Sequence, residues 1–129
     1  MKLIAVIEDR GGMMFNHRRV SKDRELVLRV EELIKGHRLW IHPCSADLFP
    51  DAIVDGNFLG NAGEEDFCFV EDCSVKGFEN RVQEVFLFHW NRRYPADIFF
   101  DLPMDQFSLV HTEEFKGYSH EKITLETWK

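Results

Sequence analysis

The sequence has no apolar run of the length that a membrane span requires, which is about 20 residues. Its first apolar stretch ends at Glu8, too early for the hydrophobic region of a secretory signal peptide. We therefore expect a protein that does not enter a membrane and carries no secretion signal.

Cysteine is scarce, with three residues at Cys44, Cys68 and Cys73. An odd set without a paired framework excludes the disulfide-stabilised secreted class, so we expect free thiols and a cytoplasmic protein. Together with His42 these thiols supply ligand types that zinc prefers, but their spacing matches no closed zinc site. We therefore predict no metal.

Positive charge is in short supply, because 16 Lys and Arg residues face 23 Asp and Glu residues. The formal net charge is −7 and the isoelectric point is about 5.3. Such a field repels nucleic acid and anionic membranes at long range, so neither is an expected partner. A local basic patch can still attract a small anion.

Several motifs of catalysis and cofactor binding are missing. The chain contains neither a Gly-x-Ser-x-Gly nucleophile turn nor a phosphate loop ending in Gly-Lys-Ser/Thr. We predict no cofactor.

What the chain does contain is typical of one globular domain, 1–129. Hydrophobic residues make up 44% of it and twelve are Phe, which predicts an aromatic-rich core. The continuously apolar runs 3–7 and 85–88 predict strands that are buried on both faces, with 3–7 in the centre of a sheet, and 67–70 predicts a further strand. The alternating run 122–128 predicts a strand with one buried face.

One amphipathic helix is predicted between Ser21, as its N-cap, and Gly36. Leu26, Val30 and Leu33 share its apolar face. Further short strands are predicted at 38–41, 52–54, 98–100 and 108–111, and a helical turn capped by Ser45. The fold class that follows is α/β, with a mixed, largely parallel sheet, flanking helices and a C-terminal antiparallel hairpin.

Both ends of the chain resemble the dihydrofolate reductase family. Asp-Arg-Gly-Gly-Met-Met at 9–14, followed by Asn16, Asp23 and a helix, is similar to that family's N-terminal unit. Segments 94–100, 107–110 and 117–124, with Trp128, are similar to its last strands and terminal hairpin. The resemblance implies a reduced version of that fold, in which Asp23 matches the carboxylate that grips the pterin ring and Met13–Met14 lie in a mobile loop over the substrate.

The departures from that family concern its nucleotide site. Its Gly-Arg-x-Thr turn is replaced by His42-Pro43-Cys44-Ser45, and its Gly-Gly turn by His89-Trp90-Asn91; its Trp-Pro step before the acid is missing. Glycines let a backbone approach a pyrophosphate, and an indole in their place should block it. We therefore predict that the protein does not bind NADPH productively, and we favour a non-reductase function.

A second resemblance is to small bacterial proteins that carry the name ribonuclease Z. That activity requires the metal motif His-x-His-x-Asp-His, which does not occur in this chain. The resemblance therefore implies a bacterial protein but no ribonuclease activity.

Two loops share an aromatic residue, an asparagine and an arginine pair. They supply the predicted ligand-binding residues, which are Asn16, Arg18, Arg19, Asp23, Asn91, Arg92 and Arg93. Each loop follows a strand that is predicted to be central, and parallel strands bring such loops together at the carboxyl edge of the sheet. Lys22 and the amino end of the helix would join them there. The alternative is that these arginines pair with some of the 23 acids.

Three functions remain open at this stage. The first is a non-reductase protein that binds a small anionic or heterocyclic molecule. The second is an enzyme, either a divergent reductase or a hydrolase that uses Asp23 as an acid, although an acid in the first helical turn also stabilises the helix. The third is an interaction module whose arginine loops dock on an acidic surface. The sequence does not predict the oligomeric state.

Overall fold

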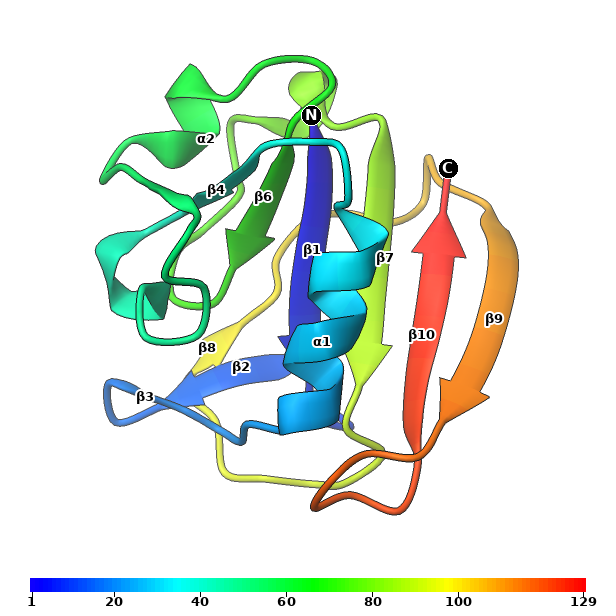
Figure 1. Ribbon diagram of the computed structural model, residues 1–129. Helices are drawn as coiled ribbons and strands as arrows, with labels where there is room; N and C mark the ends of the chain where they lie inside the picture. Colours follow the sequence, from blue (N-terminus) through cyan, green and yellow to red (C-terminus); the bar gives the residue numbers. More distant parts are fainter.

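The computed structural model describes residues 1–129 and is built around a seven-stranded sheet. Figure 1 shows its strands, which lie in the order β5 (Ile53–Val54), β4 (Leu39–Ile41), β6 (Phe67–Val70), β1 (Lys2–Ile7), β7 (Glu84–His89), β10 (Ile123–Trp128) and β9 (Leu109–Phe115). The first five strands pair in parallel, and β10 runs antiparallel to both β7 and β9. The predicted mixed, largely parallel sheet with a C-terminal antiparallel hairpin is confirmed.

Strand β1 occupies the centre of this sheet, as its continuous apolar run predicts. It pairs with β6 from Lys2 to Ala5 and with β7 from Lys2 to Ile7. Alternate residues enter two separate core clusters: Leu3 and Ala5 lie on one face, and Ile4 lies on the other with the rings of β6 and β7. Burial on both faces explains why these strands show no polar alternation.

Helix α1 (Arg24–Leu33) covers one face of the sheet, in front of β1 and β7 in Figure 1. Its residues Leu26 and Val30 are fully buried in the cluster of Phe side chains on that face. The predicted N-cap was wrong, because Asp23 caps the helix and accepts from the backbone N–H of Glu25. The carboxylate reaches the free N–H groups of the first turn, and Ser21 lies too far before them.

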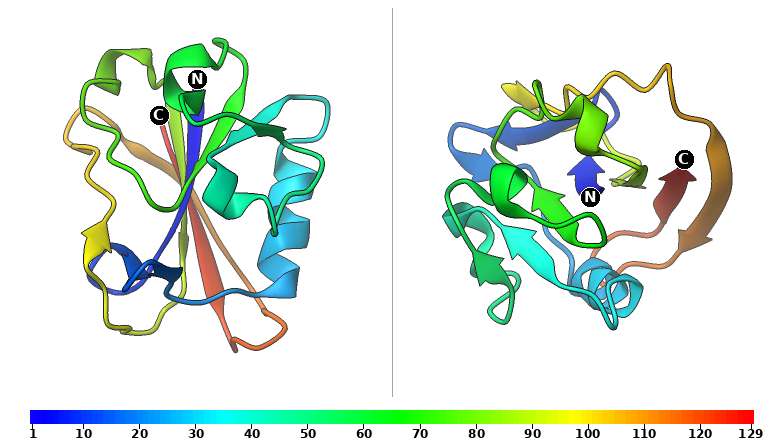
Figure 2. Two further views of the ribbon diagram at one scale, coloured as in Figure 1. Left: turned by 90° about the vertical axis from the view of Figure 1, so that its left-hand side faces the viewer. Right: turned by 90° about the horizontal axis from the view of Figure 1, so that it is seen from above.

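The opposite face is covered mainly by irregular chain, as Figure 2 shows. The short helix α2 (Phe58–Asn61) contributes Phe58 and Leu59, and the segments after β6 and β8 contribute Val75, Val82 and Leu102. The only other helical turns are 3-10 turns at Pro43–Ser45 and Glu79–Arg81. The first is capped by the His42 side chain, so the predicted Ser45 cap was wrong.

A small three-stranded sheet adjoins the end of β1, with the order β3 (Arg18–Arg19), β2 (Gly12–Phe15) and β8 (Ile98–Phe99). The region predicted as a loop is therefore a hairpin. Its two turn residues, Asn16 and His17, have φ of 51° and 65°, as a two-residue turn with the twist of paired strands requires. Met13 and Met14 are buried in β2.

The longest helix, α1, has ten residues and carries several charges. No helix of this structure has the length and apolar character needed to cross a bilayer.

Candidate functional site

The loops that follow β1 and β7 lie at the same edge of the sheet, because these parallel strands end together at Ile7 and His89. The buried carboxylate of Glu8 joins the two loops. It accepts from the backbone N–H groups of Arg10 at 2.7 Å, Gly12 at 2.8 Å and Tyr94 at 3.3 Å. Burial raises the pKa of Glu8, but these hydrogen bonds outweigh it and leave the pKa below its usual value.

The β2–β3 hairpin is also tied to the loop after β7. The backbone N–H of Asn16 donates to Asp97 Oδ2 at 3.0 Å, and the N–H of Asp97 donates to the Met14 carbonyl. The two loops that carry the arginine pairs are thus neighbours in space. The side chains predicted to bind a ligand do not all line the same groove, however.

Asn91, Arg92 and Arg93 lie outside the groove described next. The Asn91 amide donates to Thr124 Oγ1 at 2.9 Å and to the Lys122 carbonyl at 3.1 Å, so it ties this turn to β10. Arg92 and Arg93 are exposed and form no ion pair.

An open groove of about 630 Å³ runs along the outside of β3. Its lining includes the cationic side chains Arg18, Arg19 and Lys22, with His17 beside them. The remaining lining residues are Met14, Ser21, Cys44 and Asp47. Arg18 and Lys22 form no ion pair, although Asp47, which pairs with Arg19, lies near enough to Lys22 to interact with its charge. We refer to these eight residues as the basic groove.

Arg19 forms part of the wall of the basic groove and is not free to clamp a ligand. Its guanidinium donates to Glu71 through Nε at 2.8 Å, to both oxygens of Asp47, and to the Cys44 carbonyl. The hydrogen bonds that Arg19 donates to Glu71 and Asp47 raise its pKa above the usual value. Arg19 therefore pairs with acidic residues, which is the alternative that the sequence left open.

Asp23 is 3% exposed and its acceptor capacity is used by its own chain. Oδ1 accepts from the N–H groups of Glu25 and Tyr118, and Oδ2 from Ser119 and from Nδ1 of His120. A carboxylate has about four lone-pair sites, so none is left for a pterin ring. Burial raises the pKa of Asp23, but the bonds from Tyr118, His120 and Ser119 lower it far more.

His120 completes a buried network that the sequence did not reveal. Its Nδ1 lies 2.9 Å from Asp23, and its Nε2 lies 3.1 Å from both Ser21 Oγ and Tyr94 Oη. The ring stacks on Trp90, with centroids 4.4 Å apart. The sequence placed His120 in a terminal hairpin, but no local pattern put it beside residues 97 and 99 positions earlier.

A small cavity of about 20 Å³ lies between α1 and the sheet, lined in part by Val6, Asp23, Leu26, Phe69 and Trp90. A volume of this size holds one water molecule. Trp90 is 3% exposed, lines this cavity together with Asp23, and stacks on the His120 ring that Asp23 holds. The position that the family resemblance assigns to a substrate ring is therefore closed in this chain.

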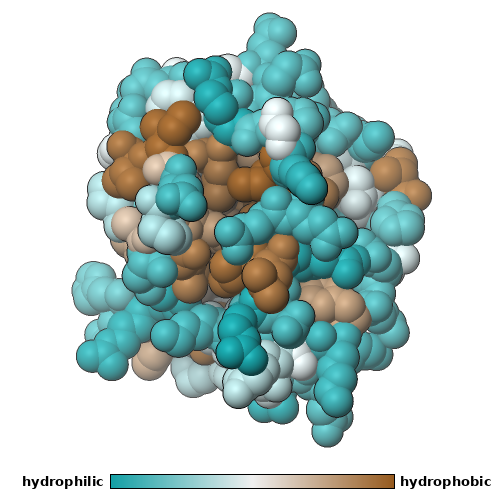
Figure 3. All heavy atoms as spheres, viewed as in Figure 1, coloured by the Kyte–Doolittle hydropathy of each residue, from teal (hydrophilic) through white to brown (hydrophobic).

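A second hollow lies on the face that carries α1, where Figure 3 shows hydrophobic residues gathered. It has a volume of about 340 Å³ and is lined by the end of α1, by Leu39 and by the segment from Phe49 to Ile53.

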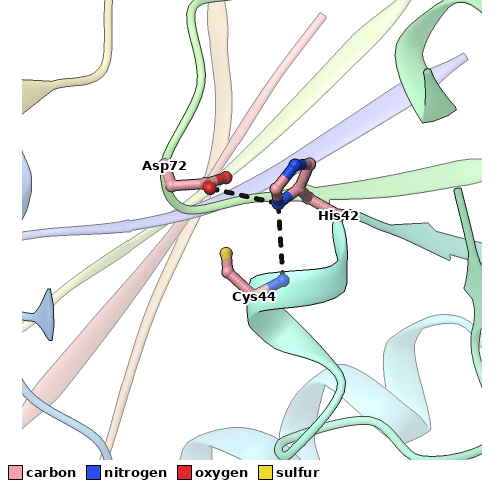
Figure 4. Close-up of side chains that lie close together, drawn as sticks. All are labelled: His42, Cys44 and Asp72. Atoms are coloured by element: carbon pink, nitrogen blue, oxygen red, sulfur yellow. Dashed lines mark hydrogen bonds and ion pairs between the residues drawn. The ribbon is translucent and has the colours of Figure 1, made fainter. Parts of the chain in front are cut away.

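His42, Cys44 and Asp72 meet at the carboxyl ends of β4 and β6, as Figure 4 shows. Burial raises the pKa of the Cys44 thiol to about 12. All three cysteines are free, and Cys68 lies elsewhere, in the core against Met1.

Comparison with known proteins supports the fold alone. Neither protein-family models nor curated protein sequences give a match. Among solved structures, the chain is similar to a dihydrofolate reductase from Enterococcus faecalis complexed with NADP(H) and RAB-propyl, with a TM-score of 0.71 and 11% identity. The similarity covers 99% of this chain and 95% of that one. The protein therefore has a dihydrofolate reductase-like α/β fold.

Proposed function

We propose that this protein is a non-reductase binding protein that holds a small anion, of the phosphate or carboxylate class, in the basic groove. The observation that carries the proposal is the pair Arg18 and Lys22, which line one groove without a carboxylate partner in a chain of net charge −7. Like charges held together repel one another, and a bound anion relieves that repulsion through charge-assisted hydrogen bonds.

The position of the groove supports the proposal. It lies near the carboxyl ends of the parallel strands, where open α/β sheets bind ligands. Lys22 directly precedes the Asp23 cap of α1, so the positive end of that helix adds to the local potential. The fixed Arg19–Asp47 pair gives the groove a rigid wall.

The closed cavity beside Asp23 argues against reduction of a pterin. Ligand pockets for drug-sized molecules have volumes of about 300 Å³ or more, whereas this one has about 20 Å³. To reach Asp23, a pterin would have to displace the buried Trp90 indole. It would also have to replace the five hydrogen bonds that the Asp23 carboxylate already accepts.

Calorimetric titration with inorganic phosphate, pyrophosphate and citrate tests the proposal. We expect one binding site whose affinity falls as sodium chloride rises, because salt screens the groove. NADPH with dihydrofolate should give no turnover. Absence of binding for all three anions at low salt would contradict the proposed groove, and turnover of dihydrofolate would contradict the non-reductase assignment.

A second candidate, hydrolysis of an anionic ester, is favoured by the Ser21–His120–Asp23 arrangement. Ser21 lines the basic groove, and its Oγ lies within hydrogen-bond distance of an imidazole that is oriented by a carboxylate. The lowered pKa of Asp23 removes the role of acid considered from the sequence, because the group stays ionised near neutral pH. It would instead orient His120.

In this second candidate, Ser21 Oγ attacks the ester carbonyl carbon and its proton passes to His120 Nε2. That proton leaves with the alcohol, and water then hydrolyses the acyl group from Ser21. A fluorophosphonate probe followed by peptide mass spectrometry tests the arrangement. Labelling of Ser21 that survives in Ser119→Ala and disappears in Ser21→Ala supports a hydrolase, and an unlabelled Ser21 rejects it.

A further inference from the structure

Three side chains of ligand type converge beside the basic groove, outside the network around Asp23. His42 follows β4, Cys44 lies in the 3-10 turn Pro43–Ser45, and Asp72 follows the end of β6. Strands β4 and β6 are parallel neighbours in register from Leu39 to Ile41, so their carboxyl ends bring these residues together. Figure 4 shows the imidazole and the carboxylate in contact, with the thiol beside them.

The distances among the three ligand atoms approach those of a metal site. His42 Nδ1 lies 3.1 Å from Asp72 Oδ2, and the imidazole, thiol and carboxylate atoms all lie within 4.8 Å of one another. In a tetrahedral zinc site, bonds of about 2.0–2.3 Å hold the ligand atoms roughly 3.5 Å apart. To surround one ion, the ligand atoms that now lie farthest apart would have to approach by roughly 1 Å.

A second observation points to a missing partner. Asp72 Oδ1 is buried and accepts no hydrogen bond, and it is the only buried side-chain nitrogen or oxygen in residues 1–129 without a partner. Burying such a group without a partner is unfavourable, because it loses its hydrogen bonds to water and gains none in the protein. The thiol of Cys44 has a hydrogen-bond contact of 3.6 Å to Ser45 Oγ and lies beside the Asp72 carboxylate. A cation between the two groups would satisfy both.

We propose that His42, Cys44 and Asp72 form a binding site for a divalent transition metal of the zinc class, with one coordination position left open. An imidazole nitrogen together with a thiolate sulfur selects zinc or cobalt over magnesium or calcium. Binding forms one bond to each residue, releases the thiol proton to solvent, and replaces the 3.4 Å hydrogen bond that His42 Nδ1 accepts from the Cys44 backbone N–H. The proposal replaces the sequence-based expectation of no metal, which considered only His42 with the three cysteines.

The site does not depend on the proposed anion function. Cys44 also lines the basic groove, so the ion would lie at the groove wall, but the three ligands and the orphaned oxygen are independent of Arg18 and Lys22.

Titration of chelator-treated protein with Co²⁺ tests the proposal directly. We expect one equivalent to bind and to give a near-ultraviolet thiolate-to-cobalt band together with the visible bands of a tetrahedral site, and Zn²⁺ should displace it. Cys44→Ser should abolish the thiolate band. Asp72→Asn, which keeps the side-chain shape, should weaken Zn²⁺ binding at least tenfold in competition with a chromophoric chelator.

The matched control is Cys73→Ser, which removes the neighbouring thiol outside the cluster. It should leave both the cobalt spectrum and the Zn²⁺ affinity unchanged. Circular dichroism checks that each variant is folded. Binding without a thiolate band, or equal loss in Cys73→Ser and Cys44→Ser, would overturn the proposal.

Discussion

The carboxylate of Asp23 lies 2.9 Å from Nδ1 of His120, 97 residues further along the chain. This contact joins the start of α1 to the hairpin between β9 and β10. The family resemblance assigns Asp23 to a ligand, but in this structure the same side chain holds the fold together. A ligand at this edge of the sheet therefore has to bind through neighbouring side chains that form no ion pair, such as Arg18 and Lys22.

Asp23→Asn should destabilise the protein by about 3 kcal/mol, because an amide in this position leaves buried donors without an acceptor. Asn can still cap the helix through Oδ1, so the loss comes from the bonds to Ser119 and His120. Urea unfolding at pH 7 measures the change. A loss below about 0.5 kcal/mol, the usual size of a surface change, would contradict the buried network.

The same carboxylate makes stability depend on pH in acid. The folded-state pKa of Asp23 is lowered below its unfolded value, so its stabilisation is complete above the unfolded pKa of about 4 and is lost as the pH falls toward the folded pKa. Wild type should therefore lose stability below about pH 4 more steeply than Asp23→Asn. Parallel curves for the two proteins between pH 2 and pH 5 would exclude this origin.

Gly12→Ala should destabilise the edge where the candidate site lies. A Cβ at Gly12 would lie 2.2 Å from the Ala96 Cβ and 2.9 Å from Glu8 Oε1, so the two loops would have to separate. We expect a cost of about 2 kcal/mol or more. Gly56→Ala is the control, because its added Cβ meets nothing within 4 Å. Similar melting temperatures for the two variants would contradict the close approach.

Trp128→Ala should destabilise the fold without affecting anion binding. Trp128 packs against the core cluster opposite α1, but it is only partly buried. The expected cost is about 2 kcal/mol, below the ~3–5 kcal/mol of a fully buried aromatic. An unchanged melting temperature would show that the end of β10 contributes nothing to stability.

The sequence predicted those parts of the fold that depend on local pattern. The apolar runs of β1, β6 and β7 and the alternation of β10 identified the main strands, because burial on two faces or on one leaves a direct periodicity. The β2–β3 hairpin was missed, since its turn residues are Asn16 and His17 and the usual Asn-Gly signal is absent.

The candidate site was predicted only in part, because it depends on contacts between distant residues. The two arginine loops were correctly expected at one edge of the sheet. The pairing of Arg19 with Asp47 and Glu71 depends on residues 28 and 52 positions away, and no local pattern reports it. The contact between His42 and Asp72 was not predicted for the same reason, because the two residues lie far apart in the sequence.

The most direct test of the account compares two double variants that remove the same charge. Arg18→Ala/Lys22→Ala empties the basic groove, and Arg92→Ala/Arg93→Ala removes two arginines that lie outside it. Phosphate affinity is measured by calorimetry at low ionic strength. We predict a loss of at least tenfold, or about 1.4 kcal/mol, in the first variant and a change of less than about twofold in the second. Equal losses in the two variants, or a larger loss in the second, would contradict binding in the basic groove.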